Sequence, residues 1–220
     1  MNESTSHLIR FLQQENTRLK EDNDRLHEEN QGLVNYLRLL EDLYRAAQEI
    51  GSRDDLLEIL DDTLNHAMWL TKANDGSVML LDQDSHELVF AVVHGAKRAE
   101  LRGYRIAADT GIAGWVAAQK KPVITNLPHQ DWRFSPQVDE AFAFKTHSLV
   151  CVPMLAGETM VGVIEVLNKY DDRKFNEADV KYGNFNEADV NLLLILGYVA
   201  ATAMQAQEEK VSSGDQPATV

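Results

Sequence analysis

The first 48 residues repeat a leucine at every seventh position over several heptads. These leucines are Leu12, Leu19, Leu26, Leu33 and Leu40. With them at the d positions, the a positions hold Ile9, Asn16, Asn23, Asn30, Leu37 and Tyr44. Leucine at d combined with asparagine at a favours a parallel, two-stranded coiled coil in one register. The pattern therefore predicts that residues 1–48 form a coiled-coil helix that joins two copies of the chain as a homodimer.

Residues 49–208 contain shorter apolar segments with the spacings of helices and strands. The expected elements are a helix at 54–70, strands at 77–82, 87–93 and 102–106, a helix within 109–118, an edge segment at 122–125, an excursion with one helical turn at 126–144, strands at 148–154 and 161–168, and a final helix that ends near 209. Short polar turns join neighbouring strands into hairpins. This order predicts an α+β domain, an antiparallel sheet with helices packed on it. Residues 209–220 have the composition of a disordered tail.

The end of the last strand and the start of the final helix carry complementary charges. Asn168-Lys169 closes the strand, and residues 185–190 have the features of a helix start. With Asn186 as the N-cap, Asp189 is the third helical residue, where the helix dipole favours a carboxylate. We expect the Lys169 ammonium to pair with such a carboxylate and to fasten the strand to the helix as a structural latch.

The sequence Phe-Asn-Glu-Ala-Asp-Val occurs twice, at 175–180 and at 185–190. A ten-residue offset is not a whole number of helical turns, so the two copies cannot continue one helix face. Gly183 lies between them as a helix breaker. We place the second copy at the helix start and the first in a loop or a short extra turn. The two copies could also be assigned the other way round. The partner of Lys169 is therefore either Asp189 or Asp179.

Composition narrows the possible partners of this 220-residue chain. A formal net charge of −14 argues against nucleic acid and against an anionic membrane. The apolar run 192–204 is interrupted by Gly197 and is too short to span a bilayer. The single cysteine, Cys151, cannot form an internal disulfide, so we expect a cytoplasmic location. The seven histidines lack metal-ligand spacing, and no metal site is predicted.

Several motifs together resemble one known family. They are Gly111-Ile-Ala-Gly114, Arg133-Phe134 followed by Val138-Asp139, Thr146 before Leu149-Val-Cys-Val-Pro153, and Gly162-Val-Ile-Glu-Val-Leu-Asn-Lys169 with the later Phe-x-x-x-Asp. This set is similar to the GAF domains of cyclic-nucleotide phosphodiesterases and adenylate cyclases, over roughly residues 50–207. One departure is Val190, which stands where the family has glutamate.

The resemblance implies a ligand pocket between the sheet and the segments that cover it. Position by position, it assigns ligand binding to Ser77, Ile112, Ala113, Asp139, Thr146 and Glu165, and the latch to Asn168, Lys169 and Asp189. It implies cyclic AMP or cyclic GMP as the ligand, with the cyclic phosphate at the start of the small helix, and no other cofactor. Backbone N–H groups at Gly111–Gly114 suit a phosphate. Without the resemblance, the preferred interpretation is that these glycines only permit a tight turn.

Three positions depart from the nucleotide-binding pattern. His94 stands where an acid is common, Ser135 where an aromatic ring can stack, and Phe142 where a hydroxyl would bind. Loss of such a ring or hydroxyl weakens a base site by ~1–3 kcal/mol each. We expect His94 to be an exposed histidine at a strand end. Strand alternation leaves open whether Glu165 faces the pocket or the opposite side.

Two classes of function remain. The first is a dimeric, non-enzymatic regulatory protein that senses a cyclic nucleotide and passes the signal through its helices to a downstream signalling protein. The second is a ligand-free module for dimerisation and protein docking, with its pocket filled by side chains such as Phe142. An enzymatic function is disfavoured because a lone Cys151 in a predicted core strand cannot supply the several cysteines of methionine sulfoxide reduction.

Overall fold

The computed structural model describes residues 10–27, 30, 53–170 and 183–212. The chain divides into two compact units, Met1–Asp42 and Leu43–Val220. In the first unit, residues 10–27 form a helix, and Leu12, Leu19 and Leu26 are each more than half exposed. Exposed leucines at heptad spacing are what an unpaired coiled-coil strand presents. The other heptad leucines lie outside the described residues, and their pairing stays a prediction.

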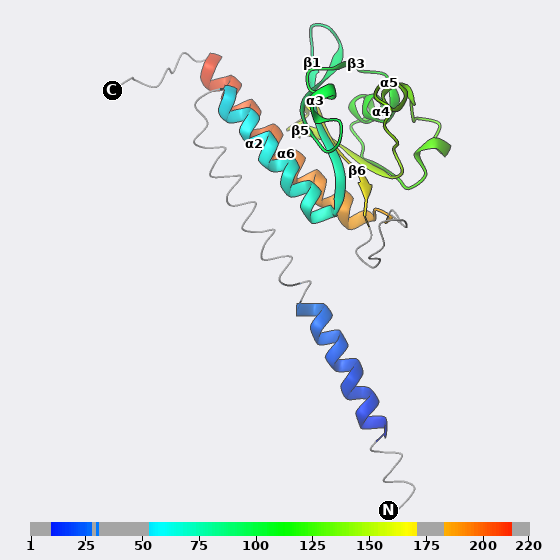
Figure 1. The fold of residues 1–220 in the computed structure, drawn as a ribbon. Coiled ribbons are helices and arrows are strands. Elements are labelled where there is room, and N and C mark those ends of the chain that lie inside the picture. Colours follow the sequence, from blue (N-terminus) through cyan, green and yellow to red (C-terminus); the bar gives the residue numbers. More distant parts are fainter. Residues whose placement is uncertain (1–9, 28–29, 31–52, 171–182, 213–220) are drawn as a thin grey trace, which may run out of the picture. The chain divides into compact units, whose positions relative to one another are not determined.

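The second unit is an α+β domain built on one six-stranded sheet (Figure 1). Its elements are α2 (Arg53–Thr71), β1 (Ala73–Asp82), β2 (Glu87–His94), α3 (Arg98–Leu101), β3 (Arg105–Ala107), α4 (Gly111–Gln119), β4 (Val123–Thr125), η1 (Pro128–Gln130), α5 (Gln137–Phe142), β5 (Leu149–Ala156), β6 (Thr159–Lys169) and α6 (Glu187–Ser212). The strand order is β3-β2-β1-β6-β5-β4, with all neighbours antiparallel. This confirms the predicted fold class.

Helices cover both faces of the sheet (Figure 1). On one face lie α2 and α6: a Cβ added at Gly76 in β1 would meet Leu64 and Met68 of α2 at 3.0 Å, and Gly197 of α6 faces Ile164 of β6. The other face carries the main apolar cluster, in which α4 packs against β1, β2, β5 and β6. The hydrophobic core is therefore split by the sheet into two layers.

Most element boundaries fall within a few residues of the sequence-based expectation. β1 begins four residues earlier than predicted, because Ala73 pairs with Lys169 of β6. The third strand is shorter than expected, and the preceding residues form α3 instead. α6 continues to Ser212, beyond the expected end near 209, and the rest of the predicted tail lies outside the described residues. The earlier start of β1 thus depends on pairing with a strand that is distant in the sequence.

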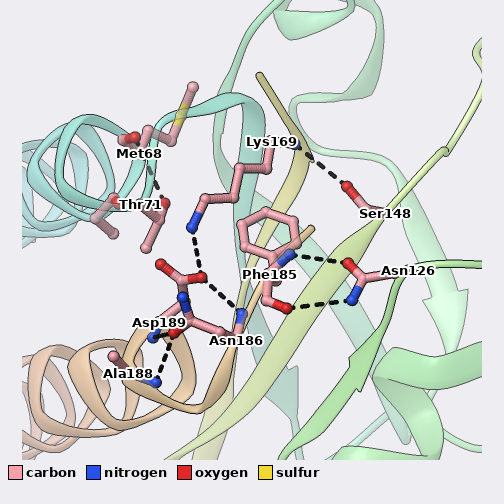
Figure 2. A network of polar contacts seen from close by, with 10 residues as sticks. Met68, Thr71, Asn126, Ser148, Lys169, Phe185, Asn186, Ala188 and Asp189 are labelled. Atoms are coloured by element: carbon pink, nitrogen blue, oxygen red, sulfur yellow. Dashed lines mark hydrogen bonds and ion pairs between the residues drawn. The ribbon is translucent and has the colours of Figure 1, made fainter. Parts of the chain in front are cut away.

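The predicted latch is present between β6 and α6 (Figure 2). The Lys169 ammonium lies 2.6 Å from Asp189 Oδ2 and 5.4 Å from the centre of the Phe185 ring. Asn186 accepts hydrogen bonds from the backbone N–H groups of Ala188 and Asp189, and its own N–H donates to Asp189 Oδ2. Asn186 is thus the N-cap of a capping box.

Asn168 positions the lysine at the end of β6. Its φ of 58° is a left-handed conformation, which interrupts the alternation of the strand. Alternation alone would place Lys169 on the same face as Glu165, whereas its ammonium reaches α6. The buried Asn168 amide also donates to Asp75 Oδ2 at 3.1 Å and accepts the His147 N–H at 2.7 Å. Asn168 therefore joins β1, β6 and the segment before β5.

The second copy of the repeated sequence is therefore the one that begins α6. Asn126 holds its first residue by two hydrogen bonds, accepting from the Phe185 N–H and donating to the Phe185 carbonyl (Figure 2). The partner of Lys169 is Asp189. The first copy, at 175–180, lies outside the described residues.

We predict that Asp189→Asn lowers the free energy of unfolding by about 3 kcal/mol, because it leaves the largely buried Lys169 ammonium without its counter-charge. Glu187→Gln, an exposed acid in the same first turn, is the matched control and should change stability by less than about 0.5 kcal/mol. Urea unfolding followed by circular dichroism measures both. Equal losses in the two variants would show that the pair contributes little beyond general helix-terminus electrostatics.

Candidate functional site

A cavity of about 100 Å³ lies between the sheet and the segments that run from α4 to the start of β5. Its lining includes all the residues to which the sequence assigned ligand binding: Ser77, Ile112, Ala113, Asp139, Thr146 and Glu165. Most of the remaining wall is apolar, with Met79, Phe90, Val93 and Leu149 among its members. A few polar groups in a mainly apolar cavity are typical of sites for small molecules.

Glu165 stands in the middle of the sheet and projects into this cavity. Its neighbours across the sheet are Ser77 on β1 and Cys151 on β5. The Ser77 hydroxyl donates to Glu165 Oε1 at 2.9 Å. The sequence left the direction of Glu165 open, and the structure places it on the cavity side together with Leu167.

The surroundings of Glu165 favour its neutral form. Burial raises its pKa from the ordinary 4.5 to about 7, and the Asp139 carboxylate acts in the same direction, whereas the hydrogen bond from Ser77 opposes the shift. The neighbouring Cys151 thiol is fully buried, and desolvation raises its pKa well above the ordinary value. Near neutral pH, Glu165 can therefore either accept or donate a proton in a hydrogen bond, and Cys151 is an inert core thiol.

Asp139 and Thr146 form a buried clamp at the wall opposite the sheet. Asp139 Oδ1 accepts the Thr146 hydroxyl at 2.8 Å, and Oδ2 accepts the Thr146 backbone N–H at 2.9 Å. The clamp connects the first turn of α5 to the residues that lead into β5. Both residues therefore hold the covering segment in place as well as lining the cavity.

The start of α4 forms another part of the wall, through Thr110, Gly111, Ile112 and Ala113. The first N–H groups of a helix have no partner within it, and the helix dipole makes this end positive. Gly111 has a φ of 69°. At Gly114 an added Cβ would lie 2.6 Å from the backbone of Asp109, so only glycine fits that turn. Gly114 thus has a steric role, and Gly111 borders the cavity.

The three positions that depart from the family pattern, His94, Ser135 and Phe142, lie in different surroundings. His94 also lines the cavity, but the expectation that it is an exposed strand-end residue is wrong: its side chain is 13% exposed, and Nε2 lies 3.0 Å from Asp61 Oδ1 on α2. Ser135 is part of the wall. Phe142 is absent from the lining and packs edge-on against Tyr104, with ring centres 5.0 Å apart.

Sequence reasoning missed several polar groups of the site. Asp75 and Lys97 line the cavity, and the Asp61 carboxylate on α2 forms a hydrogen bond with the ring of His94. None of them belongs to a local motif: Asp75 lies on β1, Lys97 directly before α3 and Asp61 on α2, so that only the tertiary fold brings them to the site. Within the described part of the chain, no group of three or more histidine, cysteine or acidic side chains could hold a metal ion.

The lining of the cavity thus combines the N-terminal end of α4 with the carboxyl groups of Glu165 and Asp139. Such a combination suits a ligand that carries both an anionic group and hydrogen-bond donors.

Comparison with known proteins identifies relatives of this domain. Residues 53–205 match the family model described as GAF domain. Over 80 residues the chain is 39% identical to the Dual 3′,5′-cyclic-AMP and -GMP phosphodiesterase 11 of Drosophila melanogaster, an alignment that covers 35% of this chain and 5% of that enzyme. The chain therefore spans a small fraction of the length of this relative.

Solved structures with the same fold have low sequence identity. The GAF domain of a phosphoenolpyruvate-protein phosphotransferase from Coxiella burnetii aligns with a TM-score of 0.65 at 14% identity, covering 81% of this chain and 98% of that one. The free methionine-R-sulfoxide reductase of Neisseria meningitidis, in complex with its substrate, aligns with a TM-score of 0.61 at 17% identity, covering 79% and 90%. At these identities the likeness shows the fold alone.

We predict that Glu165→Gln removes a pH dependence of stability. Because the folded-state pKa of about 7 lies above the ordinary 4.5, the contribution of Glu165 is fully present below that lower value and is lost as pH rises through the higher one. The variant should match the parent chain near pH 4.5 and exceed it at pH 8 by on the order of 3 kcal/mol.

The matched control for this titration is Glu158→Gln, which alters an exposed acid in the turn before β6. Denaturant unfolding at several pH values measures the free energy of unfolding of all three proteins. The control should follow the parent chain throughout. If Glu165→Gln also keeps the parent's slope between pH 4.5 and 8, the carboxyl group is hydrated and ordinary.

Proposed function

This chain belongs to the GAF domain family, and we propose that its cavity binds a small regulatory molecule, with a cyclic nucleotide as the ligand. The observation that carries the proposal is the composition of the cavity lining, which combines a helix N-terminus and two carboxyl groups with a largely apolar wall. Regulatory small-molecule sensing is the general role of this family. The identification of the ligand as a cyclic nucleotide is the more specific part of the proposal.

The chemistry of the walls supports this class of ligand. A cyclic phosphate placed at Gly111–Ala113 would accept hydrogen bonds from free backbone N–H groups and would be stabilised by the dipole of α4. The exocyclic amino and ring N–H groups of a purine are donors, which suit Glu165 and Asp139. The apolar wall, with Phe90 and Leu149, would contact the faces of the rings. The fly relative is named as acting on both cyclic nucleotides, which supports the class without choosing between them.

The small volume of the cavity favours a movement of the covering segment on binding. A volume of about 100 Å³ is below the ~300–1,000 Å³ of sites for drug-sized ligands. The segment from η1 to β5 is held by the Asp139–Thr146 clamp and by Arg133, which pairs with Asp131 and lies over the Trp115 ring. We propose that this segment opens to admit the ligand and closes again over it.

The strand that contributes Glu165 also offers a route to the helices. Lys169, four residues further along β6, pairs with Asp189 at the start of α6. Ligand contact with Glu165 would bias the position of β6 and, through the latch, of α6. We further propose that two chains paired through residues 1–48 transmit this change in the cytoplasm to a downstream signalling protein. In this proposal the domain itself catalyses no reaction.

A second function, a ligand-free docking module, is favoured by one observation. The cavity is small, and a permanently closed covering segment would exclude a nucleotide. Phe142, however, does not fill it. The two functions differ in whether any small molecule stabilises the folded chain.

We predict that one cyclic nucleotide raises the melting temperature of the full chain and that 5′-AMP and 5′-GMP do not. At one hundred times Kd, the ligand stabilises the folded state by about 2.7 kcal/mol. Ala113→Leu should abolish the shift by filling the cavity, whereas Ala118→Leu, on the exposed side of the same helix, should retain it. Thermal unfolding with millimolar ligand provides the measurement. Absence of any shift with both cyclic nucleotides would favour the docking module.

A further inference from the structure

The segment that covers the cavity presents a tryptophan to solvent. Trp132, in the turn between η1 and α5, is 83% exposed, more than any other large hydrophobic side chain that the structure describes, and Leu127 before η1 is 62% exposed. The next residues along the chain are turned inward: Arg133 lies over the Trp115 ring, and Phe134 lines the cavity. The turn is therefore held by its neighbours while its largest apolar side chain remains uncovered.

Basic side chains lie in the same part of the covering segment. His129 and Lys145 are exposed, and His147 is half-buried. Burial lowers the pKa of His147, and the charges of Lys145 and His129 lower it further, so both groups lie close enough to act on it. Asp139 opposes this effect, but its carboxylate is buried and already accepts the Thr146 hydroxyl.

The local charge differs from that of the whole chain. Residues 119–134 and 141–148 contain a single acid, Asp131, and its carboxylate is paired with Arg133 at 2.7 Å. The complete chain has a net charge of −14. A nucleic acid or an anionic membrane would extend beyond this region and meet the repulsion of the other acids. A short acidic segment would meet only the basic groups nearby, because the repulsion from distant charges is screened.

We propose that an acidic segment of a partner protein, with an apolar side chain between its acids, docks on this part of the covering segment. The docking site, here called the Trp132 surface, consists of Leu127, His129, Trp132, Lys145 and His147. The apolar side chain of the partner would cover the indole, and its carboxylates would pair with the basic groups around it. The proposal does not rest on the ligand assigned to the cavity, because none of the five residues lines it.

Fluorescence anisotropy with labelled synthetic peptides tests this docking on the full chain. The probe is a short peptide in which glutamate and leucine alternate. One comparison peptide has lysine in place of glutamate, and another has serine in place of leucine. The full chain should bind the probe at least about tenfold more tightly than either comparison peptide, because both the charge and the apolar side chains are needed.

Matched variants locate the contact. Trp132→Ala should weaken binding of the probe by about tenfold or more, whereas Trp69→Ala, which removes a 65% exposed tryptophan of α2, should leave it unchanged. Lys145→Glu should weaken binding and reduce its dependence on salt. Arg102→Glu, an exposed position beside β3 at the opposite edge of the sheet from β4, is the control for this change of charge and should have little effect.

Equal affinities of Trp132→Ala and Trp69→Ala for the probe would overturn the proposal, as would a parent chain that binds none of the three peptides. Tighter binding of single-stranded poly-uridine than of the probe would also overturn it, since a nucleic acid would then be the occupant. The melting temperature of Trp132→Ala should equal that of the parent chain, because the side chain is almost fully exposed, so a loss of binding reports the contact and not unfolding.

Discussion

The burial of one carboxyl group, that of Glu165, is the constraint on which the site depends. A charged carboxylate in a mainly apolar cavity is costly unless it is paired. Here Glu165 has a hydrogen bond from the Ser77 hydroxyl, while the negative charge of Asp139 adds to the cost. The protein meets this cost by favouring the protonated form. Any ligand that provides a donor to Glu165 would relieve the same cost, so binding and proton release are linked at this residue.

The strand that carries Glu165 also connects the cavity on one face of the sheet with the helices on the other face. β6 is central in the sheet, and it presents the acid to the cavity on one face. Asn168, in a left-handed conformation, then redirects the chain so that Lys169 reaches α6 on the other side. In the proposed function, a shift of β6 on ligand binding would act directly on the ion pair that holds α6.

Local patterns predicted the elements and the N-cap at Asn186. The family motifs predicted six of the residues that line the cavity, but not Asp75 or Lys97. They could not predict the direction of Glu165, because both faces of β6 are covered and its sequence is apolar on either side. The Asp61–His94 pair was missed since it joins residues far apart in the chain. The sequence also could not predict the size of the cavity, because that size depends on how closely the Asp139–Thr146 clamp holds the covering segment.

The central claim, a carboxyl group kept neutral by the cavity, is tested most directly by titrating Glu165 itself. Carbon-13 NMR of glutamate side-chain carboxyl groups, assigned by the missing signal in Glu165→Gln, reports its protonation as pH is varied. The structure predicts a midpoint near pH 7, moved downward in Asp139→Asn as the neighbouring negative charge is removed. A midpoint near the ordinary 4.5, unchanged in Asp139→Asn, would contradict this view of the site.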